Sequence, residues 1–267
     1  MPNSIHFKQN KFHQIVFLTA ALGLMLTISG SVLADTSNPT PAATKSSFSG
    51  NQLMGASQPP VTERPATVLG PVEGVSAKTG SSLLVLQPGS VVYLVGDSTL
   101  HKYEMGAKSL QGSAVVKASA KSLSADGGLL KALQAGKAGS MALVVPVNFL
   151  KSKESGLDDN AYKALNAKDF PEIKFELSKE TLAPGAQDGT YVMTAEGNLT
   201  ISGVTNPITL TADAQIKDNQ VRLKGVQKLK MTDYKITPPK FNLVVTSIVC
   251  TDEIEIHYDV TFAPAAK

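Results

Sequence analysis

Residues 195–210 read AEGNLTISGVTNPITL, and this stretch decides the fold because two alternating runs meet in it. Leu199 and Ile201 alternate with polar residues before the turn, and residues 208–216 repeat the alternation after it. Successive side chains of a strand point to opposite faces, so each run has one apolar and one polar face. Between the runs, residues 203–207 hold a glycine, which tolerates positive φ, and a proline, which cannot donate to a ladder. We predict a β-hairpin here, with a loop of about four or five residues.

The same alternation recurs along the C-terminal two thirds of the chain. It is cleanest in Ile254–Phe262 and clear in Met141–Leu150, and turn signals such as Gln87–Gly89 separate some of the runs. One helix is predicted at Leu157–Lys168, where apolar residues recur four positions apart, and a second, short one at Leu129–Ala135. About eight or nine strands at spacings of roughly eight to twelve residues indicate an all-β, antiparallel barrel or sandwich. A barrel of about eight strands is just wide enough to hold one small ligand.

The first 34 residues have the three parts of a secretory signal peptide. Lys8 and Lys11 precede an apolar run over residues 15–28, and small residues lead to Ala34. The run is shorter than the roughly twenty residues that a membrane span needs, which disfavours the alternative of an uncleaved anchor. We predict cleavage after Ala34 and a periplasmic or secreted mature protein with no transmembrane segment.

The signal peptide is followed by residues 35–80, which are rich in Ser, Thr, Pro, Ala and Gly and have no sustained periodicity. Such a composition buries too little apolar surface to offset chain entropy, so we predict a disordered linker. The folded domain is predicted over residues 81–264.

Composition excludes several classes of function. The formal charge of +3 includes the two signal lysines, so the mature chain is near +1, which argues against nucleic acid as a partner. The one cysteine, Cys250, cannot form an intrachain disulfide and fits a small buried hydrophobe better than a reactive thiol.

Residues that carry chemistry are scarce. Two of the four histidines lie in the signal peptide, which leaves His101, near turn-forming residues, and His257, on the polar face of the last strand. Two histidines and one cysteine leave little for a zinc or copper site. The pair Asp158–Asp159 suits the first turn of the predicted helix, where acids complement the helix dipole. Phosphate-binding loops and nucleophile elbows are absent from the sequence. We therefore predict no catalytic residues, no metal and no cofactor, with an enzyme that uses His101 as the weaker alternative.

Three motifs together resemble the YceI-like family, exported lipocalin-like proteins described as polyisoprenoid-binding. The most specific is GNLTISGVTNPI at residues 197–208, which is similar to the family's G-x-L-T-I-x-G-V-T-x-P-V hairpin. NAKDFPEIKF at 166–175 resembles the family's helix end followed by a strand, and LKMTDY at 229–234 resembles its x-R-x-D-(F/Y)-G region. Lys235 stands where the family commonly has glycine, and Asp97–His101 carries the residue types of the family's D-x-x-H-S stretch in a different arrangement.

The resemblance implies an eight-stranded antiparallel, lipocalin-like barrel that holds a long isoprenoid chain such as a quinone tail; it is also compatible with a homodimer. If the barrel is open, its lining is expected to come from the apolar faces of the strands. The ligand-binding candidates are Leu143, Val145, Val147, Phe149, Ile173, Phe175, Leu199, Ile201, Ile208 and Leu210. The same residues could instead fill a core, and the protein would then be an exported structural or interaction protein without lipid cargo.

Overall fold

The computed structural model describes residues 65–242 and 247–265. The predicted signal peptide and residues 35–64 of the predicted linker lie outside the described residues. No helix among the described residues is long and apolar enough to cross a membrane.

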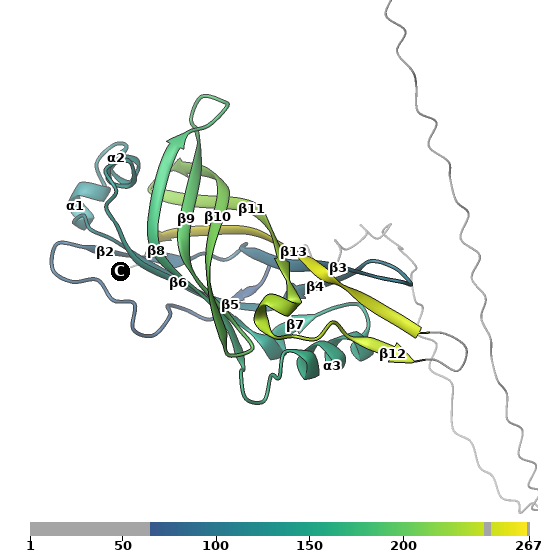
Figure 1. Cartoon of the computed structure of the whole chain (residues 1–267). Coiled ribbons are helices and arrows are strands. Elements are labelled where there is room, and N and C mark those ends of the chain that lie inside the picture. Colours follow the sequence, from purple (N-terminus) through teal and green to yellow (C-terminus); the bar gives the residue numbers. More distant parts are fainter. Residues whose placement is uncertain (1–64, 243–246, 266–267) are drawn as a thin grey trace, which may run out of the picture. The chain divides into compact units, whose positions relative to one another are not determined.

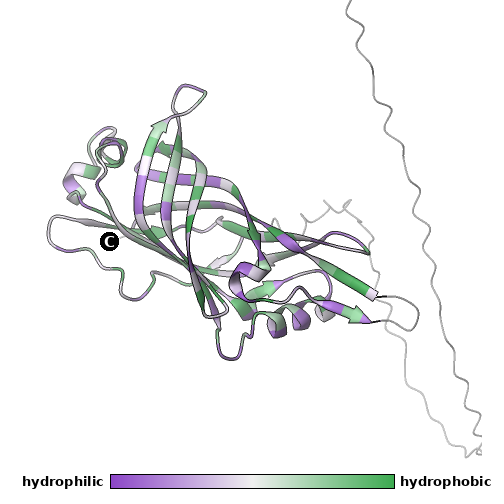
Figure 2. Cartoon of the chain, in the orientation of Figure 1, coloured by the Kyte–Doolittle hydropathy of each residue, from purple (hydrophilic) through white to green (hydrophobic). Residues whose placement is uncertain are grey.

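Eight strands close into an antiparallel barrel, in the order β2-β5-β6-β8-β9-β10-β11-β13 and back to β2 (Figure 1). Their bounds are Ser82–Leu86 (β2), Ser109–Val116 (β5), Ala138–Pro146 (β6), Glu172–Pro184 (β8), Thr190–Ile201 (β9), Val204–Lys217 (β10), Gln220–Lys230 (β11) and Ser247–Pro264 (β13). The prediction of an all-β, eight-stranded barrel is confirmed, and the sandwich alternative is excluded. Apolar and polar residues alternate along the long strands, as the bands in Figure 2 show, because one face of each strand points into the barrel.

Four further strands extend the wall at one end. They are β3 (Val91–Ser98), β4 (Tyr103–Ala107), β7 (Leu150–Lys151) and β12 (Lys240–Asn242). β2 and β3 both pair antiparallel with β13, so the turn signal at Gln87–Gly89 interrupts one long strand and does not reverse the chain. The interruption is held by hydrogen bonds from Gln87 N to Thr261 O (2.8 Å) and from Thr261 N to Ser90 Oγ (3.2 Å).

The break between β2 and β3 is filled by β1 (Thr67–Val68), which pairs parallel with the start of β5. Ala66 N donates to Ser90 O, and Thr67 N donates to Lys108 O. Residues 66–68 fall in the range predicted to be a disordered linker. That prediction fails for them because backbone pairing with neighbouring strands supplies stabilisation that composition does not reveal.

The hairpin of β9 and β10 is confirmed, but its loop is shorter than predicted. Ile201 pairs with Val204, so only Ser202 and Gly203 form the turn, both with positive φ (50° and 75°). Two-residue turns with positive φ at both positions match the right-handed twist of paired strands. Residues 204–207, predicted as loop, belong to β10.

Three short helices lie at the two ends of the barrel, where one or two were predicted. α1 (Ala120–Leu123) and α2 (Gly128–Gln134) lie at one end, and α3 (Ser155–Ala164) lies at the other, near β12 (Figure 1). Asp158 falls in the first turn of α3, as predicted. The helices therefore cover the ends of the barrel and leave its interior to the strands.

Candidate functional site

Two apolar cavities occupy the interior of the barrel. The first, about 170 Å³, is lined by inward-facing residues of the barrel strands and by Leu133 of α2. Its lining is apolar except at Glu180, Gln227 and Tyr258. The Glu180 carboxylate is already occupied, because it accepts a hydrogen bond of 3.0 Å from Ala138 N.

The second cavity, about 160 Å³, lies toward the α3 end of the barrel. Leu157 and Ala161 of α3 line it, together with Tyr103, Phe241 and Cys250 of the strands. Burial raises the pKa of the Cys250 thiol, which also contacts Tyr103. The expectation that Cys250 is a small buried hydrophobe is confirmed.

The two cavities adjoin, because six residues line both. These junction residues are Val92, Val145, Ile173, Leu199, Leu229 and Ile256. They come from six strands, one from each, so they encircle the interior between the two ends. The arrangement is an elongated apolar space that runs from α2 toward α3.

Seven of the ten predicted ligand-binding residues line this space. Leu143, Phe175 and Leu210 line the first cavity, Ile201 lines the second, and Val145, Ile173 and Leu199 belong to the junction. Their apolar faces point inward, so the structure places them where a ligand would lie. Whether they bind one is a proposal.

The other three predicted residues lie elsewhere. Val147 is buried but lines neither cavity, and Phe149 is 46 % exposed. The predicted alternation ends at Pro146, because residues 147–149 form a 3₁₀ turn, in which side chains no longer alternate between two faces. Ile208 lines a groove in the barrel wall and neither inner cavity.

Other cavity residues were missed although the same pattern marks them. Met193 and Ala195 continue the inward face of β9, and Leu223 and Leu229 that of β11. Reading every strand with period two from one known inward residue would have found them.

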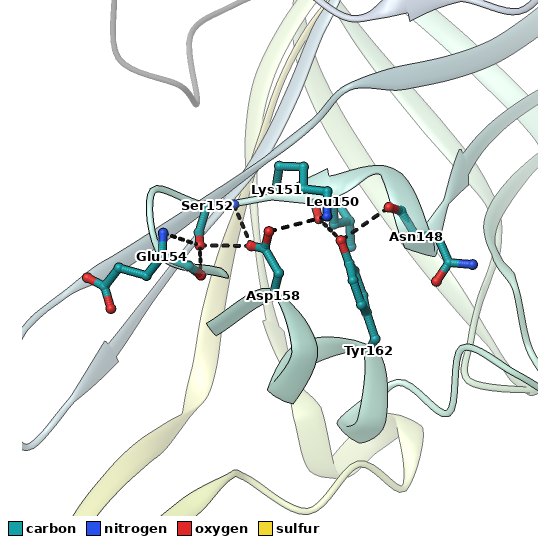
Figure 3. Close-up of polar contacts among 7 residues, drawn as sticks. All are labelled: Asn148, Leu150, Lys151, Ser152, Glu154, Asp158 and Tyr162. Atoms are coloured by element: carbon teal, nitrogen blue, oxygen red, sulfur yellow. Dashed lines mark hydrogen bonds and ion pairs between the residues drawn. The ribbon is translucent and has the colours of Figure 1, made fainter. Parts of the chain in front are cut away.

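A polar cluster fixes α3 over its end of the barrel (Figure 3). The carboxylate of Asp158, a residue that is 5 % exposed, accepts hydrogen bonds from Ser152 N (2.7 Å) and Ser152 Oγ (2.8 Å) and lies 3.4 Å from Lys151 Nζ. Tyr162 Oη donates to Leu150 O (2.6 Å). Each contact joins α3 to the segment that follows β6, so the cluster holds the helix whose Leu157 and Ala161 line the second cavity.

The two histidines of the folded domain lie away from the cavity lining. His101 is exposed in the turn between β3 and β4, with Nδ1 2.7 Å from Lys102 O. The His257 ring stacks on Tyr93, with ring centroids 4.6 Å apart. Among the described residues, no group of three or more His, Cys, Asp or Glu is placed to hold a metal ion.

Comparison with known proteins gives one family. The YceI-like domain family matches residues 97–262. Similar solved structures include BcnA of Burkholderia cenocepacia, 17 % identical, with 64 % of this chain and 95 % of that chain covered and a TM-score of 0.48. A polyisoprenoid binding domain from Saccharophagus degradans is 10 % identical over 69 % of this chain and 99 % of that chain, with a TM-score of 0.49. The YceI protein of Campylobacter jejuni is 17 % identical over 50 % and 77 %, with a TM-score of 0.37. No curated protein sequence matches this chain.

Proposed function

The chain belongs to the YceI-like family, and from this premise we propose that it is an exported binding protein that holds an isoprenoid lipid in its barrel. The observation that carries the proposal is the pair of adjoining apolar cavities. The cargo is a quinone-like or polyprenyl chain, and the protein acts on it by binding, without a chemical step. A polyisoprenoid binding domain among the similar structures is consistent with this class of cargo.

Apolar burial alone accounts for affinity in such a site. Each methylene moved from water into an apolar environment contributes about 0.8 kcal/mol. An engineered apolar cavity of about 150 Å³ binds benzene, so each cavity here holds roughly six carbon atoms. The two together accept roughly two isoprene units in the form described, and side-chain movement would extend that length.

The proposed test is identification of the bound molecule. The protein is purified from a periplasmic extract and weighed by native mass spectrometry, and its solvent extract is then analysed for lipids. We expect one isoprenoid per barrel. As a control, the extracted and refolded protein is titrated with a quinone that carries a C15 tail. A folded protein that arrives empty and also fails to take up this quinone would refute the proposal and favour a filled barrel.

Export is tested separately by the mass of the mature chain. Cleavage after Ala34 predicts a periplasmic protein that begins at Asp35. Recovery of the uncleaved chain from the cytoplasm would contradict this part of the proposal and leave the binding function standing.

A further inference from the structure

β10 and β11, two long neighbouring strands of the barrel wall, are paired over less than half of their length. β10 pairs with β9 from Val204 to Gln215, and β11 pairs with β13 from Val221 to Lys230. Between β10 and β11 the register covers only Asp213–Lys217 and Gln220–Lys224. Both strands are fully described, and their pairing does not continue into Val204–Ala212 or Gly225–Lys230. We call these two unpaired lengths the seam.

Two residues in the seam are of types that suit the absence of hydrogen bonds between β10 and β11. Pro207 lies in β10, although proline cannot donate to a ladder and is confined to strand edges. Gly225 lies where β11 leaves β10, and a Cβ there would collide with Tyr258 Oη and Thr211 O. The seam is therefore built into the sequence at both strands.

Tyr258 marks the end of the seam. Its ring lines the first cavity, and its hydroxyl passes Gly225 to donate to Thr211 O on β10 (2.9 Å). A side chain thus bonds to β10 two residues beyond Asp213, where the pairing with β11 ends. At the other end of the seam, Asn206 Nδ2 donates to Asp233 O (2.8 Å). These two bonds tie β10 to β13 and to the turn after β11, and neither closes the wall between β10 and β11.

A groove of about 610 Å³ is lined by residues of both lengths of the seam, among them Pro207 of β10 and Lys228 of β11. Gln227 and Leu229 line both this groove and the first cavity. Leu229, Lys230 and Tyr234 line both the groove and the second cavity. The groove and the interior are therefore separated by side chains alone, without an intervening layer of backbone hydrogen bonds.

We propose that the seam is the opening through which the isoprenoid tail enters the barrel sideways, and that the polar head of the ligand stays in the groove. This inference rests on the proposed function. Opening requires rotation of Gln227 and Leu229, whereas entry through either barrel end would require displacement of α2 or α3.

The charges of the groove favour an uncharged head. Lys228 and Lys230 are balanced by Asp233 and Glu253. Lys228 Nζ is already 2.9 Å from Glu253 and 3.5 Å from Glu255. A diphosphate would have to break these ion pairs, so a hydroxyl or quinone head fits better.

The test closes the seam with a reducible, thiol-reactive cross-linker. Thr209→Cys and Lys228→Cys place thiols on the exposed faces of the two strands, in a Cys250→Ala background. Lys217→Cys and Gln220→Cys, in the same background, form the control pair, because these residues are exposed and already paired. Binding of a quinone with a C15 tail is followed in a stopped-flow instrument by quenching of tyrosine fluorescence, since the chain has six Tyr and no Trp.

We expect the cross-link at the seam to slow association at least about tenfold, with recovery on reduction, and the control cross-link to leave the rate unchanged. A second variant, Gln227→Phe, which adds bulk without adding a tryptophan to the fluorescence signal, is expected to slow association without a cross-linker. An unchanged rate in both seam variants would overturn the seam as the opening and leave the binding function intact. Failure of every form, including the unmodified protein, to bind the quinone would instead refute the proposed function. Tighter binding of a C15 diphosphate than of the C15 quinone would overturn the inference that the groove accepts an uncharged head.

Discussion

Val145→Phe should divide the apolar interior in two. Val145 is 7 % exposed and belongs to the junction residues that line both cavities. A benzyl group in place of its isopropyl group would fill the passage between them, so an isoprenoid tail could occupy only one. Roughly six carbon atoms of the tail then lose their place in an apolar cavity.

The expected loss of affinity follows from that number. Six methylenes at about 0.8 kcal/mol each correspond to about 5 kcal/mol as an upper value. Ordering of the tail reduces the net gain, so we expect a loss of about 3–4 kcal/mol, or roughly 100- to 1,000-fold in Kd. Quinones with C5, C10, C15 and C20 tails are titrated against both proteins. The loss should grow with tail length and be small for C5.

The control is Val226→Phe, the same exchange on the outer face of β11, where Val226 is 52 % exposed. It should bind every tail as the unmodified protein does. Thermal unfolding checks that Val145→Phe still folds, since overpacking costs about 1–3 kcal/mol where no free space receives the new side chain. Equal Kd values for the C20 quinone in the unmodified protein and folded Val145→Phe would show that the tail does not span the two cavities.

Three further predictions concern stability. Lys235 has a φ of 57°, which glycine adopts with less strain. Lys235→Gly should therefore raise the free energy of unfolding, measured in urea, by about 0.5–1 kcal/mol. Lys235→Ala is the control that keeps the strain, and no gain in stability over this control would contradict the prediction. Asp158→Asn should lower the free energy of unfolding by about 1–3 kcal/mol in the same assay, because it removes a charge-assisted acceptor for Ser152 and the ion pair with Lys151. Asp159→Asn, at an exposed site, should change the stability little. Equal effects of the two substitutions would argue that the polar cluster does not hold α3 in place. Burial, together with the charge of Asp213, raises the pKa of Tyr258 to about 12, so the folded protein holds this proton more tightly than the unfolded chain. The resulting contribution to stability is complete below pH 10 and is lost as the pH rises through 12. Tyr258→Phe should therefore flatten the dependence of the unfolding free energy on pH in this range, and an unchanged slope would count against the shift.

The barrel could be predicted because period-two patterns report which face of a strand is buried. The inward residues of β8 and β9, such as Phe175 and Leu199, followed directly from alternation. The pattern failed where the backbone stops being a strand. Val147 and Phe149 kept the alternation in sequence, but the 3₁₀ turn after Pro146 rotates each side chain away from its expected face.

The hairpin turn differs from its prediction for another reason. The sequence predicts that Gly203 and Pro207 lie in one loop, whereas Gly203 belongs to a two-residue turn and Pro207 to a strand. Proline in a strand signals a missing neighbour, and Gly225 in the next strand signals a close approach. The two signals were present in the sequence, but their meaning depends on β10 and β11 being neighbours, which only the closed barrel establishes.

The seam also explains how a closed barrel could release its cargo without unfolding. β9 and β10 share twelve paired residues, and β11 and β13 share ten. Separating either pair would break on the order of ten hydrogen bonds at about 1 kcal/mol each, which is comparable to the whole stability of a domain. At the seam this cost is already absent, since Thr211 O is held by Tyr258 and no ladder has to open. Rotation of Leu229 and Gln227 costs only changes of rotamer, so an opening here can be rapid while the rest of the wall stays paired.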